Sequence, residues 1–197
     1  ETGLFASASI DFSTAGADAY LKVADNASLS FDDSDDKAFS ISAWVKIAST
    51  SGIFPIVTKI STGATQEYYF AIEGSNLIFF TSDANEDHRE NVFTAASQMA
   101  SFVGKWAHVV CTADSGTGTG SPRYHRSTLD YRYANGSIDE VSIWGAELTE
   151  AEVLEIYNGG NFESNIFSGP GDLSTHSQYS SLVSWWRLGD TGDTISS

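Results

Sequence analysis

A strand that leads directly into a capped helix is the strongest constraint in this 197-residue chain, and it lies between Tyr133 and Gly160. The pair Asn135-Gly136 is a turn signal, and the apolar residues that alternate after it predict a strand. The alternation slips by one residue at Asp139-Glu140. Such a slip predicts a bend or a β-bulge, which re-aims a carboxylate.

Helix signals follow this strand at once. Thr149 is a good N-cap residue, and Glu152 stands three residues later as its partner in a capping box. Leu148 can pack onto Val153 as a hydrophobic staple, and the glycine pair 159–160 stops the helix. The segment therefore predicts one strand followed by one short helix.

The chain as a whole has the composition of one sizeable β domain. The clearest strand runs from Phe39 to Ile47, where apolar residues alternate with serines, Trp44 and a lysine. Hydrophobic residues make up 41% of the chain and aromatic residues 13%, which is ample for a core. Cys111 is the one cysteine, so no intrachain disulfide can form, and its apolar neighbours predict a buried thiol.

The charge balance limits the classes of partner. The formal net charge is −16, from 26 acidic and 10 basic residues, and it repels nucleic acids and anionic membranes. No stretch approaches the ~20 apolar residues of a membrane span, so membrane insertion is not expected. Divalent cations and neutral polyhydroxyl compounds are compatible with such a surface.

Three stretches together resemble one known family of β-sandwich domains. They are NGSIDEVSIWGAELTEAEVLEIYNGG (135–160), AFSISAWVKIAST (38–50) and GKWAHVVCTAD (104–114). Their order and content resemble the laminin G-like and pentraxin-like jelly rolls of the concanavalin A-like lectin/glucanase superfamily, over roughly residues 8 to 160. Modules of this kind occur in phage virion and bacterial surface proteins. The resemblance implies an all-β fold, a two-sheet antiparallel jelly-roll sandwich with one short helix near its C-terminal end.

The resemblance divides the chain into three parts. Residues 1–160 form the laminin G-like jelly roll, residues 161–180 have the composition of a linker, and residues 181–197 hold a further alternating strand. That last strand is either the closing strand of the sandwich or the start of a following module. Between residues 114 and 132, where the family has two strands, this sequence has either short loops or missing chain.

Three residues are the candidates for ligand binding: Trp44, Tyr69 and Asn135. Trp44 lies on the second face of the 39–47 strand, where a tryptophan can stack on a sugar ring or, alternatively, pack beneath a loop. Tyrosine and asparagine add aromatic and amide groups that hold carbohydrate at a sheet face or rim. His108, by contrast, is expected to be a hydrogen-bonded structural residue.

Calcium is the cofactor that the acidic positions indicate. Asp11 and Asp18 match acidic positions of the opening hairpin in the resembled family. If that hairpin lies beside the strand after residue 135, either carboxylate converges with Asp139, and calcium takes about six to eight such oxygen ligands. The alternative is that Asp139 caps the turn at Asn135-Gly136.

The chain lacks the sequence signatures of catalysis. No E-x-D-x-x-E strand of a retaining glycoside hydrolase occurs, and no H-E-x-x-H or G-x-S-x-G motif. We therefore interpret the sequence as a non-enzymatic recognition or adhesion module that binds surface glycans, within a larger extracellular or virion-surface protein. The alternatives are a structural module that contacts neighbouring subunits of a viral particle, and a glycoside hydrolase of the same superfamily. The expected partners are carbohydrate or glycoprotein and the neighbouring subunits of an assembly.

Overall fold

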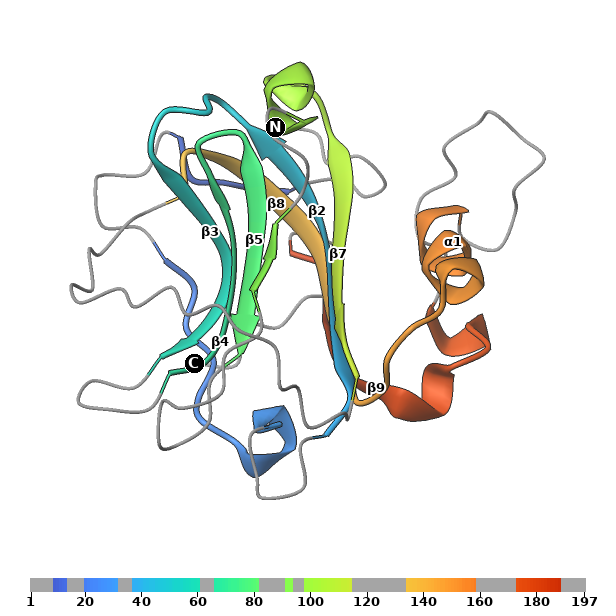
Figure 1. Cartoon of the computed structure of the whole chain (residues 1–197). Helices are drawn as coiled ribbons and strands as arrows, with labels where there is room; N and C mark the ends of the chain where they lie inside the picture. The colour runs from blue at the N-terminus through green and yellow to red at the C-terminus, as the bar shows by residue number, and fades with distance from the viewer. Residues whose placement is uncertain are drawn as a thin grey trace.

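A computed structural model describes residues 9–13, 20–31, 37–60, 66–81, 91–93, 98–114, 134–158 and 173–188. Two antiparallel sheets lie face to face, and one helix lies beside the outer face of one sheet (Figure 1). Sheet A has the order β1 (Ile10–Asp11), β8 (Gly136–Trp144), β2 (Phe39–Ile47) and β7 (Ala107–Ala113), with β9 (Leu182–Trp186) also paired to β8. Sheet B has the order β3 (Ile53–Ile60), β4 (Gln66–Glu73), β5 (Asn76–Thr81) and β6 (Asn91–Phe93). The expected all-β, two-sheet antiparallel sandwich is confirmed.

The helical elements are short. They are α1 (Glu150–Asn158) and the 3-10 turns η1 (Ala27–Leu29), η2 (Gln98–Phe102), η3 (Leu173–Thr175) and η4 (Tyr179–Ser181). The predicted capping box is present, because the backbone N of Thr149 donates to Glu152 Oε2 at 2.7 Å and Glu152 N donates to Thr149 Oγ1 at 3.4 Å. Within the part of the chain that the structure describes, no helix has the length and apolar character of a membrane span.

The core lies between the two sheets because each strand sends alternate side chains inward. The inward residues of β2 are at most 3% exposed, and they meet aromatic and aliphatic side chains from sheet B: Phe39, Ile41, Ala43, Val45, Ile47, Phe54, Phe70, Ile72 and Phe79. The rings of Phe31 and Phe39 stack at 4.4 Å. Cys111 of β7 joins the same core, and its burial raises the pKa of its thiol. The prediction of a buried thiol is confirmed.

The predicted bulge in β8 is also confirmed. Ser42 pairs with Ser142, but Trp44 pairs with Asp139, so two residues of β8 lie opposite one residue of β2. Glu140 occupies the bulge with φ 50°, a left-handed conformation that is uncommon for a residue with a side chain. The extra residue places both carboxylates, of Asp139 and of Glu140, below 4% exposure rather than at the rim.

Two strands share one edge of β8. β1 pairs with residues 137–138 of β8, and β9 pairs with residues 141–144 of the same strand. The alternating strand that follows residue 181 is therefore hydrogen-bonded into sheet A (Figure 1). Residues 115–133 and 159–172 lie outside the described part of the chain, so the proposed linker and the compressed 114–132 region stay predictions.

Candidate functional site

The three predicted ligand-binding residues do not form one site. Trp44 lies on the outer face of sheet A and is 2% exposed, whereas Tyr69 lies on the outer face of sheet B, 8% exposed, against Ala71 and Ile53. Asn135 is exposed, in the turn before β8. The expectation that these two rings stand open on a sheet face therefore needs correction, because other side chains cover both of them. The part that each residue plays in binding stays a prediction.

The predicted calcium ligands are partly brought together. Asp11 pairs with Ser137, so β1 places it on the strand next to Asp139, as the convergence of hairpin and closing strand requires. However, Asp11 Oδ1 accepts a hydrogen bond from Ser13 N at 2.8 Å. Hydrogen bonding to the side chain of Ser13, and then to its backbone, holds the pKa of Asp11 below its ordinary value. Asp139 Oδ1 accepts from Glu140 N at 2.9 Å, which supports the bulge.

No metal-binding group of three His, Cys, Asp or Glu residues occurs among the described residues. Asp18 lies outside that part of the chain. Calcium therefore stays a prediction.

The outer face of sheet A carries a row of three side chains from neighbouring strands. His108, Trp44 and Asp139 are register partners across β7, β2 and β8. The ring centroids of Trp44 and His108 are 5.1 Å apart, and His108 Nε2 lies 2.7 Å from Ser42 Oγ. Burial lowers the pKa of His108 to about 4, so its imidazole is neutral at pH 7. The expectation that His108 is hydrogen-bonded is confirmed.

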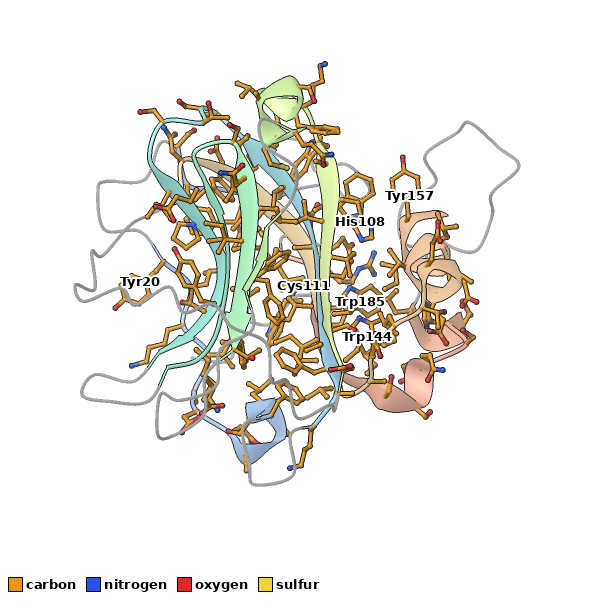
Figure 2. All side chains as sticks on the ribbon, viewed as in Figure 1. Tyr20, His108, Cys111, Trp144, Tyr157 and Trp185 are labelled. Atoms are coloured by element: carbon orange, nitrogen blue, oxygen red, sulfur yellow. The ribbon has the colours of Figure 1, made fainter. Side chains whose placement is uncertain are left out.

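Tyr157 of α1 lies over two members of this row, Trp44 and His108. Its ring stacks on Trp44 with centroids 5.5 Å apart and an interplanar angle of 21°, and its centroid is 5.8 Å from that of His108. Figure 2 shows Tyr157 and His108 facing each other between α1 and sheet A. Tyr157 remains 37% exposed although Trp44 beneath it is buried. The sequence alternative is that Trp44 packs beneath a loop; the side chain over it instead comes from the helix α1.

The bulge carboxylate of Glu140 is fixed by the chain that returns as β9. Trp185 Nε1 donates to Glu140 Oε2 at 2.6 Å, and Arg187 Nε lies 3.5 Å from Glu140 Oε1. The guanidinium of Arg187 also lies over the Trp185 ring, 5.1 Å from its centroid. A glycoside hydrolase needs carboxyl groups that reach the scissile bond, whereas Asp139 and Glu140 are 0% and 3% exposed. This pair is arranged as a structural support.

A second group of contacts joins α1 to the 3-10 turns η3 and η4. His176 Nε2 donates to the carbonyl of Glu152 at 2.9 Å, and Ser177 N donates to Glu155 Oε2 at 2.9 Å. Trp144 lies below the helix with 0% exposure, packed with Leu148, Ile156 and Leu173. The helix is therefore held firmly over the Trp144 end of the sheet (Figure 2).

Among the residues that the structure describes, four loops lie together at one end of the sandwich, and we call them the loop rim: residues 47–52, 73–76, 98–105 and 134–136. Backbone hydrogen bonds of 2.9 to 3.1 Å join the four loops: Gly74 N to Gly52 O, Met99 N to Ser75 O, Gly104 N to Ile47 O and Ala48 N to Asn135 O. Figure 1 shows the β2–β3 and β4–β5 turns and η2 together at this end. The loops therefore form one connected surface.

The side chains of the loop rim are mostly small and uncharged. Its residues include one acid, Glu73, and one base, Lys105, in a chain of net charge −16. Phe102 and Val103 are each 40% exposed, and Asn135 is exposed. Sequence reasoning missed Phe102 and Val103 because a short 3-10 turn carries no periodic signal.

Comparison with solved structures gives distant likenesses. The receptor-binding domain of botulinum neurotoxin type G is 19% identical with a TM-score of 0.42, and the match covers 61% of this chain and 38% of that chain. The receptor-binding domain of the C/D mosaic serotype is 18% identical with a TM-score of 0.45, over 62% of this chain and 36% of that chain. The chain thus spans well under half the length of these proteins. No curated protein sequence matches it.

Family membership comes from the sequence profile. Residues 15–121, more than half of the chain, match the profile described as the concanavalin A-like lectin/glucanases superfamily. The two antiparallel sheets agree with that fold. The chain belongs to the concanavalin A-like lectin/glucanases superfamily.

Proposed function

We propose that this chain is a non-catalytic recognition module that binds neutral surface glycans through the loop rim. The observation that carries the proposal is the loop rim itself, a hydrogen-bonded surface with an exposed aromatic ring at Phe102 and an exposed amide at Asn135. An aromatic ring stacks on the apolar face of a sugar, and amides and hydroxyls bond its hydroxyl groups. A site joined by backbone hydrogen bonds also loses little conformational entropy on binding.

The charge distribution supports a neutral ligand. An acidic surface repels acidic polysaccharides and nucleic acids, whereas a neutral sugar is indifferent to it. With Glu73 and Lys105 as its charged residues, the loop rim offers no cluster of cations that would recognise an anionic glycan. Binding is therefore expected to be insensitive to salt.

The test is a glycan array of neutral and acidic oligosaccharides, followed by titration calorimetry. Phe102→Ala and Asn135→Ala are each expected to weaken binding about tenfold, as loss of a stacking or hydrogen-bonding contact does. Tyr179→Ala is the matched control, because Tyr179 is 51% exposed on η4, outside the loop rim. An array on which no neutral glycan binds, or on which all four proteins bind equally, contradicts the proposal.

The biological context that we propose is a larger virion or cell-surface polypeptide, with the module outside the cell. It rests on the modules that the sequence resembles. Immunogold labelling of particles and cells that carry the parent protein, with an antibody against this module, tests it. Label confined to the cell interior contradicts it.

One observation favours a second function, contact with neighbouring subunits. Tyr20, Leu21 and Val23 are 70%, 48% and 53% exposed in an extended segment near sheet B. Exposed apolar side chains in such a run are a feature of protein interfaces. Analytical ultracentrifugation tests it: concentration-dependent association that Leu21→Ser and Val23→Ser abolish supports subunit contact, and a monomer at all concentrations contradicts it for self-assembly.

A further inference from the structure

The stack of Tyr157 on Trp44 has the geometry of a ligand on its receptor. The two rings are nearly parallel, with their centroids 5.5 Å apart, and Trp44 is 2% exposed beneath a ring that is itself 37% exposed. A pyranose ring bound to a tryptophan occupies the same place, parallel to the indole and partly open to solvent. Tyr157 thus occupies the position that a sugar ring would take.

The helix that carries Tyr157 is held in place by contacts of other residues. The body of α1 is anchored at Trp144, Leu148 and Ile156, and His176 fixes it to the turns that follow. Tyr157 lies in the last turn of α1, which ends at Asn158. Its ring lies against Trp44 and His108, and rotation about its side-chain bonds would move the ring away from both.

The surroundings of Trp44 suit a hydroxylated ring. His108 flanks it on β7 as its register partner, and Tyr157 lies over both rings. His108 is neutral at pH 7, so it can donate or accept a hydrogen bond without a charge.

We infer that Tyr157 is a side-chain gate over a second sugar-binding position, in which a neutral pyranose displaces the Tyr157 ring and stacks on Trp44. The inference rests on the proposed carbohydrate function and adds a second, self-blocked position to it. The stacking contact on Trp44 is kept in this exchange, because the sugar ring takes the place of the tyrosine ring. The apparent affinity of this position for sugar is the intrinsic affinity multiplied by the fraction of molecules in which the gate is open.

The experiment compares Tyr157→Ala, which removes the gate, with Tyr157→Phe, which keeps the stacked ring. We expect Tyr157→Ala to bind the neutral oligosaccharide about tenfold more tightly than wild type does at this position, and Tyr157→Phe to behave as wild type. The probes are maltohexaose, cellohexaose and chitohexaose, measured by titration calorimetry. Because residue 157 is partly exposed, both variants are expected to fold, and near-ultraviolet circular dichroism checks this.

A fluorescence measurement on the same variants gives an independent test. Acrylamide quenches tryptophan emission on contact, so Tyr157→Ala is expected to show a larger quenching constant than Tyr157→Phe. Bound oligosaccharide is expected to reduce that constant again, because it covers Trp44. Equal quenching in the two variants overturns the gate.

Two further variants separate this inference from the loop-rim function. Phe102→Ala is expected to remove binding at the loop rim and leave the binding gained in Tyr157→Ala, whereas Trp44→Phe in the Tyr157→Ala background removes only that gain. If wild type binds glycan and Tyr157→Ala gains nothing, the gate is wrong and the loop-rim function stands. If wild type binds no glycan but Tyr157→Ala does, the loop-rim function is wrong and the gate stands.

Discussion

The side-chain hydroxyl of Ser40 on β2 forms two hydrogen bonds with the segment that leads into α1. Its Oγ accepts from the backbone N of Leu148 at 3.0 Å and donates to the carbonyl of Ala146 at 2.8 Å. Ser40 is 0% exposed and Leu148 is 4% exposed, so water does not compensate if the hydroxyl is lost. We expect Ser40→Ala to lower the free energy of unfolding by about 1–3 kcal/mol in urea denaturation. Ser101→Ala, which removes an exposed hydroxyl bonded to Gln98 O, is the control and is expected to change it by less than about 0.5 kcal/mol.

Gly136 is the position where the backbone of sheet A tolerates no side chain. Its φ is 146°, and a Cβ there would lie 2.1 Å from the carbonyl oxygen of Lys46. We expect Gly136→Ala to destabilise the fold by more than about 3 kcal/mol or to prevent folding, because backbone atoms must move. Gly74→Ala is the matched control, since φ is 59° there and no atom lies within 4 Å of the added Cβ. Its expected cost is about 1–2 kcal/mol in thermal unfolding, and equal losses at the two sites would contradict the steric argument.

The neutral imidazole of His108 makes stability depend on pH. Its pKa is about 4 in the folded protein, below the ordinary value of 6.5, so between these two values the unfolded chain binds more protons. Stability from this group is therefore complete above pH 6.5 and is lost as the pH falls towards 4, by an upper bound of roughly 3 kcal/mol. Denaturation at pH 7 and pH 5 checks the sign, with His108→Gln as the non-titrating control. An NMR titration that places the pKa of His108 near 6.5 would refute the assignment.

The capping box of α1 predicts a second, more acidic effect. The hydrogen bond from the backbone N of Thr149 lowers the pKa of Glu152 from its ordinary value of 4.5, so its contribution is present above that value and is lost as the pH falls below it. We expect Thr149→Ala to lower the free energy of unfolding by about 1 kcal/mol at pH 7, with a smaller difference from wild type in acid. Glu150→Gln, in the same turn but outside the capping box, is the control. Circular dichroism melting curves measure all three proteins.

The elements that rest on local chemistry were predictable from the sequence. The slip at Asp139-Glu140 indicated the bulge because alternation along a strand is a local property, and Thr149 with Glu152 indicated the start of α1 for the same reason. Their combination with the family motifs was enough to give the two-sheet sandwich.

The site depends on contacts between distant parts of the chain, and local signals do not contain them. Trp44 alternates correctly for an outward side chain, but whether its face is open depends on Tyr157, more than a hundred residues later. Glu140 is buried because Trp185 and Arg187 lie beside it. The sequence did not predict this contact, because it left open whether the last strand belongs to this sandwich or to a following module. His176 gave no signal, because a lone histidine in a serine-rich segment predicts no contact.

The buried position of Cys111 makes this chain convenient for spectroscopy. Thiol reagents require an accessible thiolate, and a core cysteine with a raised pKa offers none. Leu154 is 36% exposed on α1. A cysteine introduced there would therefore be the single site that a nitroxide or a dye labels in the folded protein. Single-site labelling of α1 therefore does not require the replacement of Cys111, because the Cys111 thiol does not react.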